Sequence, residues 1–255
     1  MAVVDKKELE TKVKEMYRAV AENPNGQFHF EMGRKLAERL GYPTSDLNRL
    51  PRKAIDSFAG VGYHFGLADI QEGEHVLDLG SGSGMDVFFA ALKVGPSGRV
   101  AGVDMTDAQL EKAEALRVQE ELQSVSFRKG HIETLPFEEA QFDVVVSNGV
   151  INLSPEKEKV FRELSRVLKR DGRLAISDIV SEQELPEGVT CDATLWAACI
   201  GGAMQMDQYK TAIERAGLRL VSLEENLQYQ FITSSAQGAS KKYGVKSISL
   251  LATKT

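Results

Sequence analysis

The stretch that decides the fold is His75-Val-Leu-Asp-Leu-Gly-Ser-Gly-Ser-Gly84. A short apolar run leads into three glycines at alternate positions, and a helical pattern follows through Val87, Phe88 and Leu92. Glycine is needed where a chain turns tightly or where its backbone approaches a ligand. A strand, a glycine turn and a helix in this order predict the start of a βαβ unit. The turn itself is either a ligand-binding loop or only a tight connection.

Beyond this turn, short β-branched runs alternate with helical patterns. This alternation is typical of a doubly wound α/β fold with a mostly parallel sheet, here of seven strands, whose last part supplies an antiparallel edge. Thr106, followed three residues later by Gln109, predicts a capping box at one helix start. The expected strands are residues 75–79, 99–104, 125–128, 143–147, 173–178, 218–224 and 245–253.

The first 70 residues contain helical patterns and no expected strand. Apolar residues recur at helical spacing over residues 9–20 and 28–40, before Gly41-Tyr42-Pro43 interrupts them. Two such stripes need an apolar partner surface. We therefore expect residues 1–70 to form a helical cap or lid over a domain of residues 71–255.

The composition restricts the classes of partner. The chain has 255 residues and a net charge of −6, and its basic residues are interspersed with acidic ones. Nucleic acid is therefore an unfavourable partner, because phosphate binding requires an uncompensated basic face. No secretory signal or bilayer-spanning run is recognisable, which favours a cytoplasmic protein that does not contact a membrane. The two cysteines, Cys191 and Cys199, are expected to be reduced thiols. We further expect a small-molecule substrate and a protein that is a monomer or a homodimer.

Polar groups follow the expected strands at the edge where doubly wound sheets bind ligands. Asp104 ends the second strand 20 residues after Gly84, where a carboxylate can accept both ribose hydroxyls of an adenosine group. Asp78 precedes the glycines and suits a positively charged ligand end. Residues 130–136 and 142–148 complete the same edge. Their order predicts a nucleoside-containing cofactor.

The motifs DLGSGSG, GVDMT, GHIETLPF, FDVVVSN and RVLKRDGRLAISD together resemble class I S-adenosylmethionine methyltransferases, over residues 70–180. VDMTDAQLEKA and LWAACIGGA are similar to the arsenite methyltransferases, which extends the resemblance to about residue 220. The resemblance implies a Rossmann-like fold, S-adenosylmethionine as cofactor and S-adenosylhomocysteine as product. It also implies that Asn148 lies beneath the methyl donor and that the cofactor contacts are Asp78, Gly80, Ser81, Gly82, Gly84, Asp104, Met105, Gln109, Ile132, Glu133 and Asn148.

This sequence departs from the arsenite methyltransferase pattern at the positions of the arsenic ligands. Arsenite methyltransferases hold trivalent arsenic with three cysteine thiolates, which suit a soft element. Two of the matching positions here are Val61 and Gly149, and only Cys199 is retained. Cys199 is either part of an acceptor site or a buried structural thiol. The loss of two thiolates favours an organic acceptor, and no metal site is expected.

The acceptor pocket is expected near the carboxyl edge of the sheet. His64 is a candidate general base; the alternative interpretation is an ordinary loop histidine without a catalytic role. Trp196 precedes Cys199 by three residues, so one helix face would carry both, although a single tryptophan is often core. The predicted catalytic residues are His64, Asn148 and Cys199, and the predicted substrate contacts are Val61, Tyr63, His64, Gly149, Trp196 and Cys199.

Three functions agree with these residues. The first is methyl transfer to a small molecule, which needs mainly alignment because the sulfonium donor is already activated. The second is methylation of arsenite or another metalloid through Cys199. The third, from a different class, is a protein that binds S-adenosylmethionine without turnover.

Overall fold

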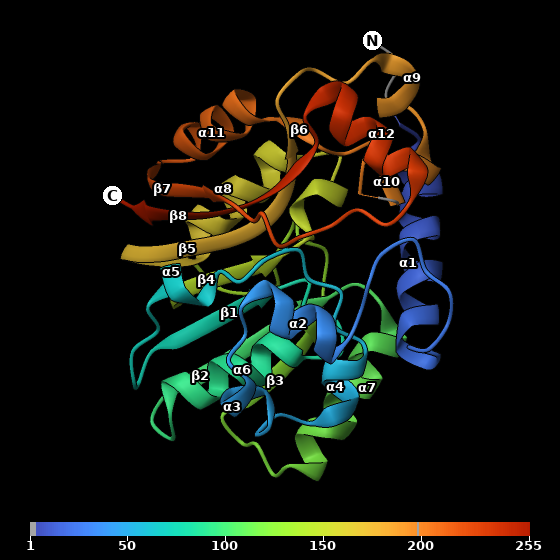
Figure 1. Ribbon diagram of the computed structural model, residues 1–255. Coiled ribbons are helices and arrows are strands. Elements are labelled where there is room, and N and C mark those ends of the chain that lie inside the picture. The colour runs from blue at the N-terminus through green and yellow to red at the C-terminus, as the bar shows by residue number, and fades with distance from the viewer. Residues whose placement is uncertain (1–3, 198) are drawn as a thin grey trace.

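The computed structural model describes residues 4–197 and 199–255 of the chain. Its centre is one mixed sheet in the order β3-β2-β1-β4-β5-β8-β7, with the two-residue strand β6 paired to β5 (Figure 1). The seven expected strands are all present. Their bounds are β1 (His75–Leu79), β2 (Arg99–Asp104), β3 (Val125–Lys129), β4 (Phe142–Asn148), β5 (Leu168–Ser181), β6 (Met204–Gln205), β7 (Leu218–Glu225) and β8 (Lys246–Lys254).

The topology confirms the doubly wound prediction. β1 pairs in parallel with both β2 and β4, whereas β8 is antiparallel to β5 and to β7. The chain winds outward from β1 through β2 to β3 and then returns to the other side at β4. The winding direction therefore reverses between β1 and β4, and the carboxyl ends of strands at such a reversal are where these sheets bind ligands.

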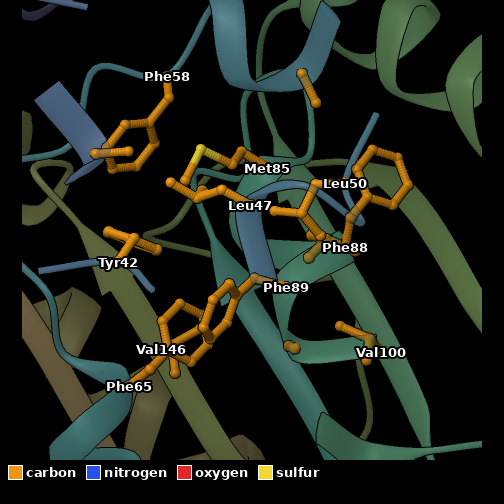
Figure 2. Close-up of a cluster of buried hydrophobic side chains, with 14 of the residues drawn as sticks. Tyr42, Leu47, Leu50, Phe58, Phe65, Met85, Phe88, Phe89, Val100 and Val146 are labelled. Atoms are coloured by element: carbon orange, nitrogen blue, oxygen red, sulfur yellow. The ribbon is translucent and has the colours of Figure 1, made fainter. Parts of the chain in front are cut away.

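Helices cover both faces of this sheet. Alternate residues of β4 supply the two faces: Val144 and Val146 join one core, and Val145 joins the other. Figure 2 shows the first core, where the N-terminal segment contributes Tyr42 and Leu47. The helices are α1 (Lys6–Glu22), α2 (Arg34–Leu40), α3 (Thr44–Leu47), α4 (Arg52–Asp56), α5 (Phe65–Ala68), α6 (Met85–Val94), α7 (Asp107–Gln119), α8 (Lys157–Val167), α9 (Glu187–Thr190), α10 (Ala193–Ala197), α11 (Met206–Arg215) and α12 (Ser234–Tyr243), with a 3-10 turn at Ile151–Leu153.

The N-terminal segment is helical, and residues 4–70 contain no strand. The second predicted helix is shorter than expected, because Gly33 has a φ of +82° and α2 begins only after it. Helices α2 to α4 pack into the same core as α6, whereas α1 lies apart from them beside α10 (Figure 1). A separate cap of residues 1–70 stays a prediction, and its residues 1–3 lie outside the described chain.

The predicted capping box is wrong. The amide of Thr106 donates to Asp104 Oδ1 at 2.8 Å, so this helix start is already satisfied. Gln109 instead joins two distant elements: its Oε1 accepts from Ser83 Oγ at 2.5 Å, and its Nε2 donates to the Tyr17 carbonyl at 2.8 Å. A side chain that forms these tertiary bonds cannot also close a local box.

Helix α1 is anchored at both ends. Near its start, Leu9 and Val13 pack in one apolar cluster with Trp196 of α10. At its end, the ammonium group of Lys112 donates to the Ala21 carbonyl at 3.0 Å, which satisfies a carbonyl that has no partner within the helix. No helix in the described ranges is long and apolar enough to cross a membrane.

The chain's single tryptophan should report this docking, because Trp196 is buried against α1. We expect the double change Leu9→Ala and Val13→Ala to weaken α1 docking by about 2–5 kcal/mol, since both side chains leave cavities. Tryptophan emission should move to longer wavelength, and acrylamide quenching should increase. Val118→Ala, at a site on α7 that is 60% exposed, is the matched control. Unchanged quenching in the double variant would show that α1 does not cover Trp196.

Candidate functional site

A cavity of about 620 Å³ lies where the carboxyl ends of β1 and β4 meet. All but one of the cofactor contacts implied by the sequence resemblance line it. They are Asp78, Gly80, Ser81, Gly82, Asp104, Met105, Gln109, Ile132, Glu133 and Asn148. The fold therefore brings residues from four separate stretches of sequence to one hollow.

The glycine turn has different requirements at its three glycines. Gly80 has a φ of +70°, and a Cβ there would lie 2.4 Å from Val150 Cγ2. Gly82 also has a positive φ, of +50°, but its nearest neighbour would be 3.7 Å away. Gly84, the one implied cofactor contact that is not on the cavity lining, has its Cβ position 2.8 Å from Phe127 Cζ. Gly84 also has a positive φ, of +90°, so its backbone conformation and the close packing against Phe127 together account for glycine at 84.

This difference predicts unequal effects of alanine within one turn. Gly80→Ala should lower the free energy of unfolding by about 2–4 kcal/mol, because backbone strain and a clash with Val150 act together. Gly82→Ala, the matched control, should cost only about 1–2 kcal/mol, because strain acts alone. Urea unfolding measures both values. Equal losses would mean that contact with Val150 does not restrict position 80.

Asp104 is held in place by backbone bonds on both sides. The Gly82 amide donates to its Oδ2 at 2.9 Å, and the Thr106 amide donates to its Oδ1 at 2.8 Å. Burial raises the pKa of Asp104, although these backbone bonds oppose the shift. The carboxylate thus borders the cavity in a fixed position with lone pairs that remain available to a ligand.

Two further carboxyl groups border the same hollow. Asp78 is 2% exposed, and burial together with the charges of Asp86 and Asp104 raises its pKa well above the ordinary value. Asp86 is 5% exposed, and burial raises its pKa to about 6. The sequence reading missed Asp86, because an acidic residue in the first turn of a helix reads as a favourable partner of the helix dipole.

The side-chain amide of Asn148 is occupied by protein groups. Its Oδ1 accepts from the Val61 amide at 2.8 Å, and its Nδ2 lies 3.1 Å from both Tyr42 Oη and the Gly62 carbonyl. Asn148 therefore ties the turn at residues 61–62 to the end of β4. Its predicted place beneath the methyl donor stays a prediction.

The polar groups that line the cavity suit a positively charged nucleoside ligand. Among the described residues, the buried carboxyl group of Asp78 lies near the like charges of Asp86 and Asp104, and the buried Ser81 hydroxyl lacks a hydrogen-bond partner. Both line the cavity. Buried polar groups are normally satisfied, so their availability here indicates a ligand. The ammonium and sulfonium groups of S-adenosylmethionine would meet acidic groups at this place.

The predicted acceptor contacts lie away from the cavity lining. The ring of Tyr63 packs 4.8 Å from that of Tyr42, and Trp196 packs against α1. Val61 and Gly149 are adjacent, since a Cβ on Gly149 would lie 3.2 Å from Val61 Cγ1. Val61 and Cys199 belong to one buried cluster, so the three positions matched to arsenic ligands are brought together beside the cavity.

His64 and Cys199 are both buried. Burial lowers the pKa of His64 to about 3, and neither ring nitrogen has a hydrogen-bond partner in the described residues. Burial raises the pKa of the Cys199 thiol to about 12. The expectation that Trp196 and Cys199 share a helix face is wrong, because α10 ends at Ala197 and Cys199 has a φ of +61°. The catalytic assignments of His64 and Cys199 stay predictions.

Helix α1 completes the cavity, which the sequence indicated only through its apolar stripe. Leu9, Val13 and Tyr17 line the hollow together with Phe58 and Leu153. Polar contacts connect the helix to the opposite rim: Lys6 forms an ion pair with Glu156 at 3.1 Å, and Glu10 Oε1 lies 3.9 Å from His131 Nε2. Within residues 4–197 and 199–255, no three or more His, Cys, Asp or Glu side chains cluster in a way that could hold a metal ion.

The chain belongs to the methyltransferase domain family, whose model matches residues 70–217, more than half of its length. Among curated relatives, the arsenite methyltransferase of Halobacterium salinarum is 41% identical over 187 residues, which are 73% of this chain and 48% of that protein. The human arsenite methyltransferase is 39% identical over 151 residues, 56% of this chain and 40% of that protein. The chain spans about half the length of these relatives.

Solved structures agree with this family. The arsenic(III) S-adenosylmethionine methyltransferase from Chlamydomonas reinhardtii has 30% identity and a TM-score of 0.63, covering 88% of this chain and 74% of that one. Geranyl diphosphate C-methyltransferase from Streptomyces coelicolor has a TM-score of 0.70 over the whole of both chains, and at 15% identity it shows the fold alone. The family is that of class I S-adenosylmethionine methyltransferases, near the arsenite methyltransferases.

Proposed function

We propose that this chain is an S-adenosylmethionine-dependent methyltransferase that acts on a small organic acceptor. The observation that carries the proposal is the cavity at the β1–β4 reversal, bordered by the buried carboxyl groups of Asp78 and Asp86 and by the half-buried one of Asp104. Burial raises the pKa of all three, and no basic side chain among the described residues is bonded to any of them. Burying charges is costly unless a partner compensates them. A cationic cofactor supplies that compensation.

Each part of the cofactor has residues suited to hold it. Asp104 would accept hydrogen bonds from the ribose hydroxyls, and Asp78 with the glycine turn would hold the methionine end. Ile132 and Glu133 would border the adenine ring, where Ser154 Oγ donates to Glu133 Oε1 at 2.5 Å. When bound, the cofactor supplies an activated methyl group.

The protein's own contribution is alignment and exclusion of water. Leu9 and Val13 of α1, with Phe58 and Leu153, give the remaining cavity wall an apolar and aromatic character. Such a wall suits an organic group and fixes its orientation by shape. A donor that is already activated reacts when nucleophile and methyl carbon are aligned, so the proposal does not require a base at His64.

Metalloid methylation is the second candidate, favoured by the arsenite methyltransferases among the relatives. Against it, Val61 and Gly149 replace two thiolates, and the raised pKa of Cys199 keeps the remaining thiol protonated at neutral pH. Cytoplasmic location, a monomeric or homodimeric state and the absence of nucleic-acid or membrane partners stay predictions from the sequence.

A single assay separates the three functions. Protein and S-adenosylmethionine are incubated with separate panels of phenols, amines and thiols, and with arsenite plus glutathione, and S-adenosylhomocysteine is measured. We expect product with an organic panel. Product with arsenite alone would replace the proposal by the metalloid function, and cofactor binding without product in any panel would favour the non-catalytic binder.

A further inference from the structure

Asp86 holds a distinctive position at the cofactor cavity. It lies in the first turn of α6, is 5% exposed and lines the hollow. Tyr42 Oη donates to its Oδ1 at 2.7 Å, and Asn148 Nδ2 donates to its Oδ2 at 3.2 Å. Each carboxylate oxygen thus accepts one hydrogen bond from these two side chains and keeps a lone pair for another group.

Asp86, Tyr42 and Asn148 form one hydrogen-bonded group. Of the three, Asp86 is the side chain whose oxygens can still accept a hydrogen bond from a ligand. The amide of Asn148 already contacts protein groups with both its oxygen and its nitrogen. Tyr42 is 2% exposed and does not line the cavity. The two partners therefore fix the orientation of the Asp86 carboxylate without shielding it from the cavity.

Among the described residues, no basic side chain is bonded to the Asp86 carboxylate. The charged groups that act on neighbouring Asp78 are Asp86 and Asp104, both acidic. In the described chain, the bonded partners of Asp86 are the neutral Tyr42 and Asn148. A full positive charge on a ligand would consequently interact strongly with this buried carboxylate.

S-adenosylmethionine and S-adenosylhomocysteine differ by one methyl group and by the positive charge on sulfur. Ribose, adenine and the amino acid group are common to both, so Asp104 contributes to the two complexes alike. Asp86 lies near Asp78, which the proposed function assigns to the methionine end, so its carboxylate would distinguish the two ligands: its attraction to the sulfur centre ends when the methyl group has left.

We propose that Asp86 is a specificity-determining residue that makes the cavity prefer S-adenosylmethionine to S-adenosylhomocysteine. The inference rests on the proposed function and deepens it. Sulfur loses its positive charge when the methyl group is transferred, so the site binds the product more weakly. The weaker binding favours product release and exchange for new cofactor.

The test is calorimetric titration of wild type and variants with each ligand separately. Asp86→Asn should lower the ratio of S-adenosylmethionine to S-adenosylhomocysteine affinity by about tenfold, because it removes a charge while conserving size. Asp86→Glu, the charge-conserving control, should keep the preference. Tyr42→Phe should keep it as well, because it removes the hydrogen bonds of Tyr42 Oη to Asp86 and Asn148 but leaves the carboxylate charge in place. Asp104→Ala should weaken both ligands by similar factors.

Thermal unfolding without ligand shows which variants are folded, and Asp86→Ser is a second neutral variant if Asp86→Asn is not. Equal affinity losses for both ligands in a folded neutral variant would overturn the inference, and so would an unchanged ratio. If wild type binds neither ligand, the proposed function itself fails. The two failures are therefore distinguishable.

Discussion

Replacing Asp104 with alanine is expected to weaken S-adenosylhomocysteine binding by about 1.5–3 kcal/mol, or roughly 10- to 150-fold. The carboxylate borders the cavity at the end of β2, and the proposed complex places both ribose hydroxyls on it. Alanine removes both acceptors. Isothermal titration calorimetry measures the effect directly.

Two controls separate ligand contact from damage to the turn. Asp107→Ala removes an acidic group three residues away, whose partner is the exposed Lys129, and should leave affinity unchanged. Because Asp104 also accepts from the Gly82 amide, thermal unfolding of the unliganded variant shows whether the turn has been lost. Full affinity in a folded Asp104→Ala protein would refute the placement of the ribose.

The second large effect concerns arsenite. The native protein should bind it weakly or not at all, and the double change Val61→Cys with Gly149→Cys should raise the affinity by about 100-fold or more, since chelation by three thiolates replaces a single ligand. Val61 adjoins Gly149 and shares a buried cluster with Cys199, so the new thiols would lie beside the retained one. Titration with arsenite, followed by thiol-to-arsenic absorbance, measures the gain.

The main cost of this design is backbone strain, because Gly149 has a φ of +72°. The smaller side chain at position 61 relieves the contact that a Cβ on residue 149 would make with Val61. Adding Cys199→Ser should abolish the gain, whereas adding Cys191→Ser should preserve it. Tight arsenite binding by the native protein would restore the metalloid function, and a folded double variant without any gain would contradict the proximity of the three positions.

The parallel core was predictable because its signals are local. β-branched runs separated by helical patterns placed β1 and β2 at the bounds that the structure shows, and the 20-residue offset identified Asp104 as a cavity residue. Buried parallel strands leave an almost continuous apolar pattern, which single-sequence reasoning detects readily.

The features that sequence reasoning predicted wrongly or missed depend on tertiary contacts. Gln109 has the sequence position of a capping residue, but distant bonds to Ser83 and Tyr17 use its amide. Asp86 resembles an ordinary helix-start acid until Tyr42 and the cavity are seen beside it. The contribution of α1 to the cavity wall likewise arises from packing between elements far apart in sequence.

The predicted acceptor site shows the same limit. The resemblance implied that Val61, Gly149 and Cys199 surround one pocket, which stays a prediction. In the structure Val61 adjoins Gly149 and shares a buried cluster with Cys199, and none of the three lines the cavity. His64 follows the same turn and is fully buried. Exposure depends on how the turn at residues 60–64 packs against β4 and β5, which no local pattern specifies.

The central claim is that the cavity between the ends of β1 and β4 binds S-adenosylmethionine. Calorimetric titration of the wild-type protein at neutral pH tests it most directly. The account predicts saturable binding of one S-adenosylmethionine per chain with a dissociation constant in the micromolar range, about −8 kcal/mol, and competition by S-adenosylhomocysteine. Absence of binding at millimolar S-adenosylmethionine by a folded protein would contradict it.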